Sequence, residues 1–216
     1  MSKKLIVCDV CDTLYRSNTT FDFIRYVVNQ RGKSLFSFHL LTNRKSPLFY
    51  MLTAIGKLTG QDLIRILSLK FLKEIPLHEL SSLADNFYFD FLIHRPNENV
   101  FRLLPTEDRA NVILFSSSLD VIVAVIAREN NLNFESSRLG WKEGKATGNL
   151  TLDLTGKKHE VVKLLVSAGD FDQLQVITDN RSDWELVKLA NERFVVIKKD
   201  NEKEFWRELK PVFIEV

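Results

Sequence analysis

Five residues with chemically useful side chains stand where predicted strands end or predicted helices begin. They are Asp9, Ser116, Lys158, Asp179 and Asp183. Chemistry on a phosphate monoester needs a nucleophile, a divalent cation that neutralises charge, and fixed cations or amides around the phosphoryl oxygens. The three carboxylates offer the hard oxygen ligands that Mg²⁺ prefers, and Lys158 would hold the attacking carboxylate near the phosphate. These residue types therefore predict a Mg²⁺-assisted phosphoryl site.

A run of serines supplies the anion-binding part of this hypothesis. Ser116 ends a strand-like run, and the backbone amides of Ser117 and Ser118 come just before a predicted helix start. Backbone N–H groups in that position bind anions. Taken singly, Asp and Ser at strand ends are more often helix caps. The hypothesis therefore depends on all of these positions occurring in order along one chain.

Short apolar runs rich in β-branched residues alternate with helical segments. The predicted strands are 4–10, 111–116, 174–178 and 194–197, and the predicted helices are 119–130, 158–168 and 183–191. This alternation predicts an α/β fold, a Rossmann-like parallel sheet covered by helices. The ligand site of such a sheet lies at the loops after the carboxyl ends of its strands. Residues 144–156 predict short strands or an irregular excursion.

The segment of residues 15–99 interrupts the alternation. Its five helical stretches are 21–29, 35–41, 48–57, 62–72 and 77–92, with Gly32, Pro47, Gly60 and Pro76 between them. We expect residues 15–99 to form an inserted helical cap domain. Residues 1–14 and 100–216 would then form the Rossmann-like catalytic core. A cap that closes over a site excludes water and usually selects the substrate.

Composition narrows the classes of function. The chain has 216 residues, of which 45% are apolar and 27% charged, as in ordinary globular proteins. Its 30 basic and 28 acidic residues give a net charge of +2, which is too balanced to indicate nucleic acid as a partner. No apolar run approaches the ~20 residues of a membrane span, and the start of the chain does not resemble a signal peptide. We expect a cytoplasmic protein without a transmembrane segment.

The predicted cap combines a basic excess with many aromatic residues. Residues 31–73 contain eight basic residues and one acidic residue, and nine of the 16 phenylalanines lie in the cap. These features fit the solvated faces and the core of a small helical layer. They also fit a pocket or surface for an anionic, partly apolar partner. We expect a phosphorylated small molecule or a lipid-linked phosphate as the partner, and the sequence leaves the oligomeric state open.

Four motifs resemble those of the haloacid dehalogenase (HAD) superfamily. Residues 5–15 resemble its first motif, an apolar strand followed by Asp-x-Asp-x-Thr-Leu, and the other three motifs are matched by 112–116, 156–162 and 176–183. The helical insertion after the first motif, the Ser116-x-Ser118 pair and the Thr147-Gly148 step are most similar to the phosphoserine-phosphatase-like branch. The resemblance covers almost the whole chain.

The resemblance implies a role for each matching residue. Asp9 would be the nucleophile that forms an aspartyl-phosphate. Ser116 and Lys158 would bind the transferred phosphoryl group, with Lys157 as the alternative to Lys158. The implied Mg²⁺ ligands are Asp9, the carbonyl of Cys11, Asp179 and, completing or orienting the metal site, Asp183.

Cys11 departs from the family pattern. Phosphatases of the family carry an Asp at this position, which protonates the leaving alcohol and then activates the hydrolytic water. Asp12 follows, but successive residues leaving a strand point in different directions. A thiol with a pKa near ~8.5 is a poor acid at neutral pH, so we expect a slow phosphatase or phosphotransferase. Two alternatives are a non-catalytic phosphate-binding or regulatory protein, and a dehalogenase-like hydrolase that displaces at carbon.

Cys8 and Cys11 also form a Cys-x-x-Cys sequence. A zinc site would need a second ligand pair, and the four histidines lack ligand spacing. Cys8 lies within the first predicted strand, so we expect it to be a buried structural thiol.

Overall fold

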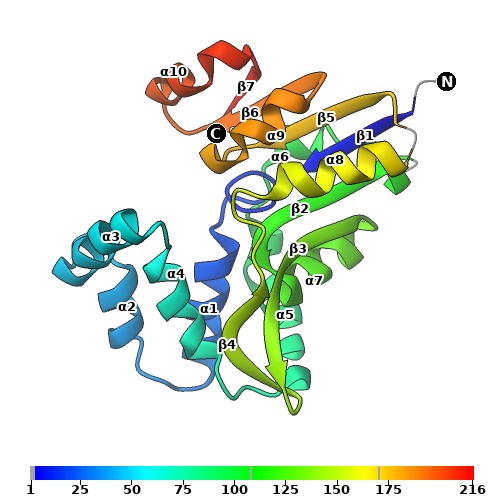
Figure 1. The fold of residues 1–216 in the computed structure, drawn as a ribbon. Coiled ribbons are helices and arrows are strands. Elements are labelled where there is room, and N and C mark those ends of the chain that lie inside the picture. The colour runs from blue at the N-terminus through cyan, green and yellow to red at the C-terminus, as the bar shows by residue number, and fades with distance from the viewer. Residues whose placement is uncertain (1–2, 108, 170) are drawn as a thin grey trace.

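The computed structural model describes residues 3–107, 109–169 and 171–216, and within them seven strands form one sheet. The strand order is β4-β3-β2-β1-β5-β6-β7, and every neighbouring pair is parallel except the antiparallel pair of β3 and β4. The strands are β1 (Lys4–Cys8), β2 (Val112–Leu119), β3 (Asn133–Lys142), β4 (Lys145–Leu152), β5 (Gln173–Thr178), β6 (Glu192–Ile197) and β7 (Val212–Glu215). This architecture confirms the predicted α/β fold (Figure 1).

Helices precede, cover and connect the strands. They are α1 (Thr19–Gln30), α2 (Phe36–Thr42), α3 (Pro47–Thr59), α4 (Leu63–Leu69), α5 (Leu77–Asp90), α6 (Glu98–Phe101), α7 (Asp120–Asn130), α8 (Lys158–Ala168), α9 (Trp184–Leu189) and α10 (Lys203–Trp206). A 3₁₀ turn, η1 (Lys70–Leu72), continues α4. The predicted bounds of α8 match the structure residue for residue.

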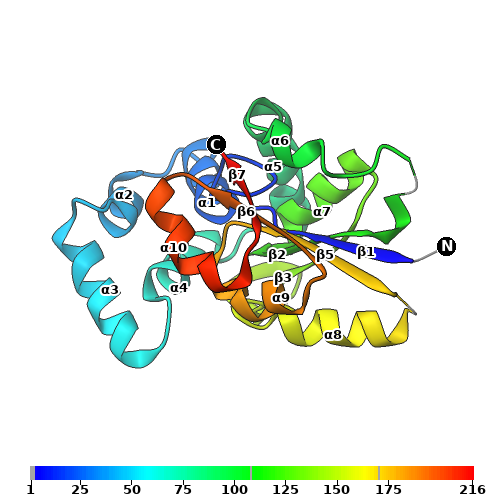
Figure 2. The same cartoon turned by 90° about the horizontal axis from the view of Figure 1, so that it is seen from above.

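The side chains of β1 divide between two hydrophobic layers. Leu5 and Val7 pack with residues of α8, α9 and α10, whereas Ile6 and Cys8 pack with residues of α1, α5 and α7. Successive residues of a strand face opposite sides of the sheet, so a fully apolar strand requires helices on both faces. Figure 2 shows these two helical layers from above. The chain leaves the buried strand at Asp9.

The helices between β1 and β2 share the core of the sheet. Phe23 of α1 and Phe87 of α5 belong to the same hydrophobic cluster as Ile6 of β1. Helices α2 and α3 lie farthest from the sheet, at one margin of the molecule in both views (Figures 1 and 2). The division into a cap of residues 15–99 and a core therefore stays a prediction.

The structure differs from the predicted elements mainly at the edges of the sheet. Strands β3 and β7 were not predicted, and residues 144–156 contain the regular strand β4. β2 continues to Leu119, where a helix start was expected. The helix predicted at 183–191 begins with a 3₁₀ turn, Arg181–Asp183, and continues as α9. β3 was missed because it mixes charged, polar and apolar residues without strict alternation, and it pairs with β4 in an edge hairpin.

Candidate active site

Lys158 joins two buried carboxylates at the carboxyl end of the sheet. Its Nζ lies 3.0 Å from Asp9 Oδ1 and 2.8 Å from Asp183 Oδ2, and none of the three side chains is more than 5% exposed. Burial by itself lowers the pKa of Lys158, but the charges of Asp9 and Asp183 raise that pKa well above its usual range. Lys158 therefore remains a cation. Lys157 is exposed, so the structure places Lys158 and not Lys157 at the site.

The carboxylate of Asp9 has one anchored oxygen and one free oxygen. Oδ1 contacts Lys158 and accepts the Val10 N–H at 2.9 Å, while Oδ2 accepts no hydrogen bond from the described residues. The Asp9 N–H donates to the carbonyl of Ile177 at 2.9 Å, which fixes the backbone beside β5. Burial raises the pKa of Asp9 to about 6, with Lys158 lowering it and Asp183 raising it. A fixed carboxylate with a free oxygen is suited to act as a nucleophile.

Asp179 lies beside Asp9 because β1 and β5 are neighbouring parallel strands. Thr13 Oγ1 donates to Asp179 Oδ1 at 2.9 Å and accepts the Asp179 N–H at 2.9 Å. Burial, and then the charge of Asp9, raise the pKa of Asp179 to about 7. Two carboxylates that disfavour each other's charge are stabilised by a cation between them.

The predicted Mg²⁺ ligands fit a divalent cation only in part. Within the described ranges, no three His, Cys, Asp or Glu side chains gather so that they could hold a metal ion. The set of Asp9, Cys11, Asp179 and Asp183 therefore does not form a cluster of side-chain ligands. Asp183 Oδ2 accepts from Lys158 and from Thr178 Oγ1 at 2.8 Å, so this oxygen is placed to orient the lysine. Asp183 Oδ1 is buried and has no hydrogen-bond partner among the described residues, so the role of Asp183 beside the metal stays a prediction. The donors that suit Mg²⁺ are the two carboxylates of Asp9 and Asp179, with a backbone carbonyl such as that of Cys11.

The three serines near the end of β2, residues 116–118, differ in burial and in hydrogen bonding. Ser116 is fully buried, and its Oγ accepts the Ser118 N–H at 3.1 Å. Ser117 Oγ is buried and has no hydrogen-bond partner among the described residues, and both Ser117 and Ser118 line the cavity at Asp9. Ser117 and Ser118 thus reach the cavity, whereas Ser116 does not line it and its Oγ takes the Ser118 amide that was expected to bind an anion. The free hydroxyl of this run belongs to Ser117, while the phosphate-binding role of Ser116 stays a prediction.

Cys11 faces a network of hydroxyl groups instead of a carboxylate. Its Sγ lies 2.7 Å from Thr19 Oγ1, which in turn donates to Ser118 Oγ at 2.8 Å. Burial, and then the charge of Asp9, raise the pKa of Cys11 to about 11, so the thiol is neutral near pH 7. Asp12 points elsewhere, because Lys198 Nζ donates to its Oδ1 at 2.6 Å. The ion pair with Lys198 agrees with the expected direction of Asp12, and its inability to replace a carboxylate at position 11 stays a prediction.

Arg65 of α4 is a site residue that sequence reasoning did not identify. It is 8% exposed, and its Nη1 donates to Asp153 Oδ1 at 2.9 Å and to Thr155 Oγ1 at 2.6 Å. Its Nη2 donates to the carbonyl of Ser117 and to Ser137 Oγ. These partners are 52 to 90 residues away in sequence, so no local pattern could have indicated them. The available signal was a single cation in an otherwise apolar helix.

A cavity of about 150 Å³ opens beside Asp9, and Lys158, Asp179, Asp183 and Ser116 are not among its lining residues. Its walls are Asp9, Cys11, Asn18, Thr20, Phe21, Asp62, Arg65, Ser117, Ser118, Thr155 and Asn180. A second cavity of about 400 Å³ shares Asn18, Phe21 and Asp62 with the first, and so adjoins it. Phe38, Phe49 and two arginines also line this second cavity. The polar cavity can receive a phosphoryl group, and the adjoining one is within the size range of small-molecule sites, ~300–1,000 Å³.

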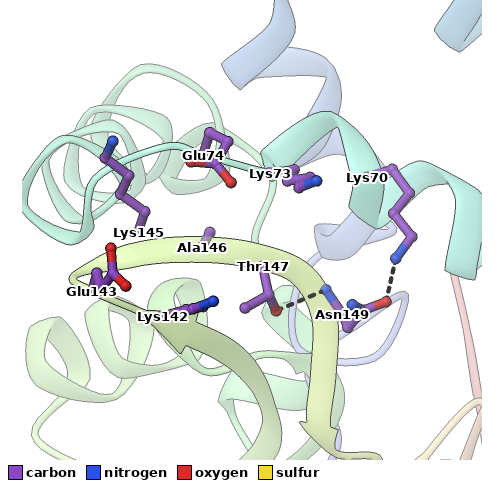
Figure 3. A pocket seen from close by; sticks show the side chains of 9 residues that line it. All are labelled: Lys70, Lys73, Glu74, Lys142, Glu143, Lys145, Ala146, Thr147 and Asn149. Carbon is purple, nitrogen blue, oxygen red and sulfur yellow. Dashed lines mark hydrogen bonds between the residues drawn. The ribbon is translucent and has the colours of Figure 1, made fainter.

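A larger cavity lies away from Asp9. It has a volume of about 590 Å³ and is lined mainly by charged side chains from η1, the residues that follow it and the β3–β4 hairpin (Figure 3). Lys70 donates to Asn149 there, and the remaining charges are exposed lysines and glutamates. This cavity contains none of the predicted site residues, whereas Asp9, Cys11 and Ser117 line the cavity of about 150 Å³.

Cys8 is the structural thiol that its position predicted. It is fully buried in the hydrophobic cluster beside α1 and α5, and its Sγ donates to the carbonyl of Asp9 at 3.2 Å. Both cysteines are free thiols. Burial, together with the charge of Asp9, raises the pKa of Cys8 far above its usual range.

The chain is similar to solved structures but to no family model and no curated protein. A protein with unknown function from Bordetella pertussis Tohama I is 14% identical, with a TM-score of 0.72 and coverage of 99% of both chains. A HAD family hydrolase from Salmonella enterica serovar Typhi is 13% identical, with a TM-score of 0.65 over 99% of this chain and 67% of that one.

A substrate-bound phosphoserine phosphatase is 17% identical, with a TM-score of 0.62 over 99% of this chain and 93% of that one. Further phosphoserine phosphatases align with similar scores. At these identities the comparison concerns the fold. The chain has the fold of the HAD hydrolases, in the form found in phosphoserine phosphatases, as its four motifs predict.

Proposed function

We propose that this protein is a Mg²⁺-dependent phosphatase or phosphotransferase that acts through an aspartyl-phosphate on Asp9. The observation that carries the proposal is the arrangement around Lys158. That buried cation holds Oδ1 of Asp9 at 3.0 Å and leaves Oδ2 free at the wall of a polar cavity. The similarity in fold to HAD phosphatases supports the same class of reaction.

The first chemical step is attack on phosphorus. Asp9 Oδ2 forms a bond to the phosphorus atom while the bond between phosphorus and the ester oxygen breaks. Lys158 and the free hydroxyl of Ser117 bind phosphoryl oxygens and stabilise the added negative charge. Mg²⁺, held by Asp9 and Asp179, would neutralise charge on the same oxygens. Water then attacks the phosphorus, which releases inorganic phosphate and restores the carboxylate of Asp9.

Cys11 makes both steps slow. A leaving alkoxide needs a proton, and the attacking water must lose one, but the neutral thiol at position 11 is a weak acid and not a base. General acid–base catalysis contributes roughly 10²- to 10⁴-fold, so the rate should fall by this order for alkyl phosphates. Aryl phosphates with stable leaving groups should suffer less.

The substrate class follows from the two adjoining cavities. The phosphoryl group fits the polar cavity at Asp9, and the rest of the molecule would occupy the cavity lined by Phe21, Phe38 and Phe49. Arg25 and Arg44 also line this second cavity, but so do Asp22 and Asp62, and Arg25 pairs with Asp22 at 2.7 Å. Arg44 is therefore the cation that would attract further negative charge there. We infer that the substrate is a phosphomonoester with an apolar part, such as a lipid-linked phosphate.

Turnover of an activated aryl phosphate with Mg²⁺ tests the proposal. We expect slow release of phosphate by the wild type, none by Asp9→Asn, and faster release by Cys11→Asp. If the wild type and both variants are inactive while the wild type still binds beryllium fluoride, a phosphate-binding or regulatory role replaces the enzymatic one. Release of halide from a 2-haloacid would instead indicate displacement at carbon.

A further inference from the structure

Helix α3 exposes an apolar face. Of its residues, only Leu52 and Gly56 are buried. Met51, Ile55 and Leu58 follow one another at spacings of four and three, so they lie on one side of the helix. Tyr50 and Ala54 lie next to them and are also exposed. Leu58 is 88% exposed. An exposed apolar helix face of this kind usually marks a surface that binds another molecule.

Helix α2 adds to this exposed apolar surface. Phe36 and Leu40 are four residues apart on one face of α2, and Phe36 is 72% exposed. α2 and α3 pack together at the margin of the molecule, away from the sheet (Figures 1 and 2). We call the exposed apolar residues of the two helices, Phe36, Leu40, Tyr50, Met51, Ala54, Ile55 and Leu58, the α2–α3 face. These side chains are exposed at the margin of the molecule that α2 and α3 form.

The charged residues of the segment that carries α2 and α3 all have one sign, although the exposed Asp62 lines a cavity together with Lys57. No Asp or Glu occurs between Asp22 and Asp62. The exposed cations Lys33, Arg44, Lys45 and Lys57 flank the two helices, and none forms an ion pair with a carboxylate of the described residues. An apolar helix face flanked by unpaired cations is typical of helices that lie in the interface of an anionic bilayer.

We propose that the α2–α3 face binds the surface of an anionic lipid bilayer. The apolar side chains of α3 enter the boundary between headgroups and acyl chains, and the flanking cations contact anionic headgroups. No helix in the described part of the chain is long and apolar enough to cross a membrane, so this contact is made by helices that lie on the surface. The inference stands independently of the proposed function.

The same two helices form part of the wall of the second cavity, which adjoins the one at Asp9. Phe38 of α2 and Phe49 of α3 line that cavity, as does Arg44 between the helices. A bilayer bound at the α2–α3 face would therefore lie close to the cavity that is inferred to take the apolar part of the substrate. Membrane binding and a lipid-linked substrate would then use one region of the protein.

Sedimentation with lipid vesicles tests the proposal. We expect the full chain to sediment with vesicles that contain phosphatidylserine, and much less with pure phosphatidylcholine. Raising the salt concentration from ~0.1 M to ~1 M shortens the Debye length from about 10 Å to about 3 Å and should weaken the binding. The double variant Lys45→Gln/Lys57→Gln should lose about fivefold per cation, since each contributes ~1 kcal/mol near an anionic surface.

The apolar contact is tested by a matched pair of variants. Leu58→Glu should reduce binding to the phosphatidylserine vesicles by at least about tenfold, since it removes a leucine from the lipid interface and adds a repelled charge. Leu164→Glu on α8 changes a leucine that is 71% exposed on a different helix layer, and it should bind as the wild type does. Equal binding by the two variants, or no binding of the wild type, would overturn the proposal.

Two further measurements separate the possible causes of failure. Both leucine variants should hydrolyse a soluble aryl phosphate at the wild-type rate, so a loss of vesicle binding does not report on the catalytic proposal. The molar mass in solution shows whether the α2–α3 face joins two copies of the chain. A dimer that Leu58→Glu dissociates, without vesicle binding by the wild type, would assign the face to self-association and refute membrane binding.

Discussion

Replacing Lys158 by Met should destabilise the protein strongly, because it leaves two buried carboxylates without their shared cation. Asp9 and Asp183 are 4% and 2% exposed, and both lie within 3.0 Å of Lys158 Nζ. Breaking a buried ion pair by removal of one partner costs roughly 3–5 kcal/mol in the free energy of unfolding. For a chain of this size, each kcal/mol lowers Tm by about 2–4 °C, so we expect a fall of roughly 6 to 20 °C.

Thermal denaturation in the presence of EDTA measures this effect without compensation by a divalent cation. Lys157→Met is the matched control, because Lys157 precedes Lys158 in the chain but is exposed, and its Tm should stay within about 2 °C of the wild type. The double variant Lys158→Met/Asp183→Asn should recover part of the lost Tm, since one of the two carboxylates is removed. If Lys158→Met has the same Tm as the wild type, the stabilising contact of Lys158 with Asp9 and Asp183 is refuted.

Three further predictions concern activity and metal binding. Cys11→Asp should raise turnover of an alkyl phosphate by at least roughly 10²-fold, and turnover of an aryl phosphate by less. An equal gain with both substrates would exclude a missing general acid. Millimolar Mg²⁺ should raise the Tm of the wild type and of Asp12→Asn but not of Asp179→Asn, because a bound ion stabilises only a chain that retains its ligands. An equal rise of Tm in all three proteins would mean that the ion binds elsewhere. Arg65→Met should lower Tm and raise KM, because the buried guanidinium holds the carbonyl of Ser117 at the cavity. An unchanged Tm and KM would show that this contact is dispensable.

Local sequence patterns were sufficient for the centre of the fold. The apolar runs of β1, β2, β5 and β6 are buried on both sides, so their composition alone indicates parallel strands. Lys158 was preferred over Lys157 because Lys-x-Glu followed by two apolar residues matches the spacing of the third motif, and the burial of Lys158 beside Asp9 agrees with that preference. Asp9 and Asp179 follow two of these strands, and the parallel pairing of β1 with β5 places them together.

Features that depend on contacts between distant segments were not predictable in this way. β3 has a mixed sequence, and β7 has only four residues, so neither carries a clear periodic signal. The contacts of Arg65 join α4 to the loops after β2 and β4, and Ser117 rather than Ser116 presents a free hydroxyl. Such pairings are determined by how the layers pack and not by the residues next to each side chain.

Trapping the phosphoenzyme tests the central claim most directly. After rapid acid quenching of the protein with Mg²⁺ and an aryl phosphate, peptide mass spectrometry should find one added phosphoryl group on the peptide that contains Asp9. Because Cys11 slows hydrolysis of the acyl phosphate, the wild type should accumulate more of this species than Cys11→Asp. Turnover by Asp9→Asn, or a phosphoryl group on another residue, would contradict the assignment of Asp9 as the nucleophile.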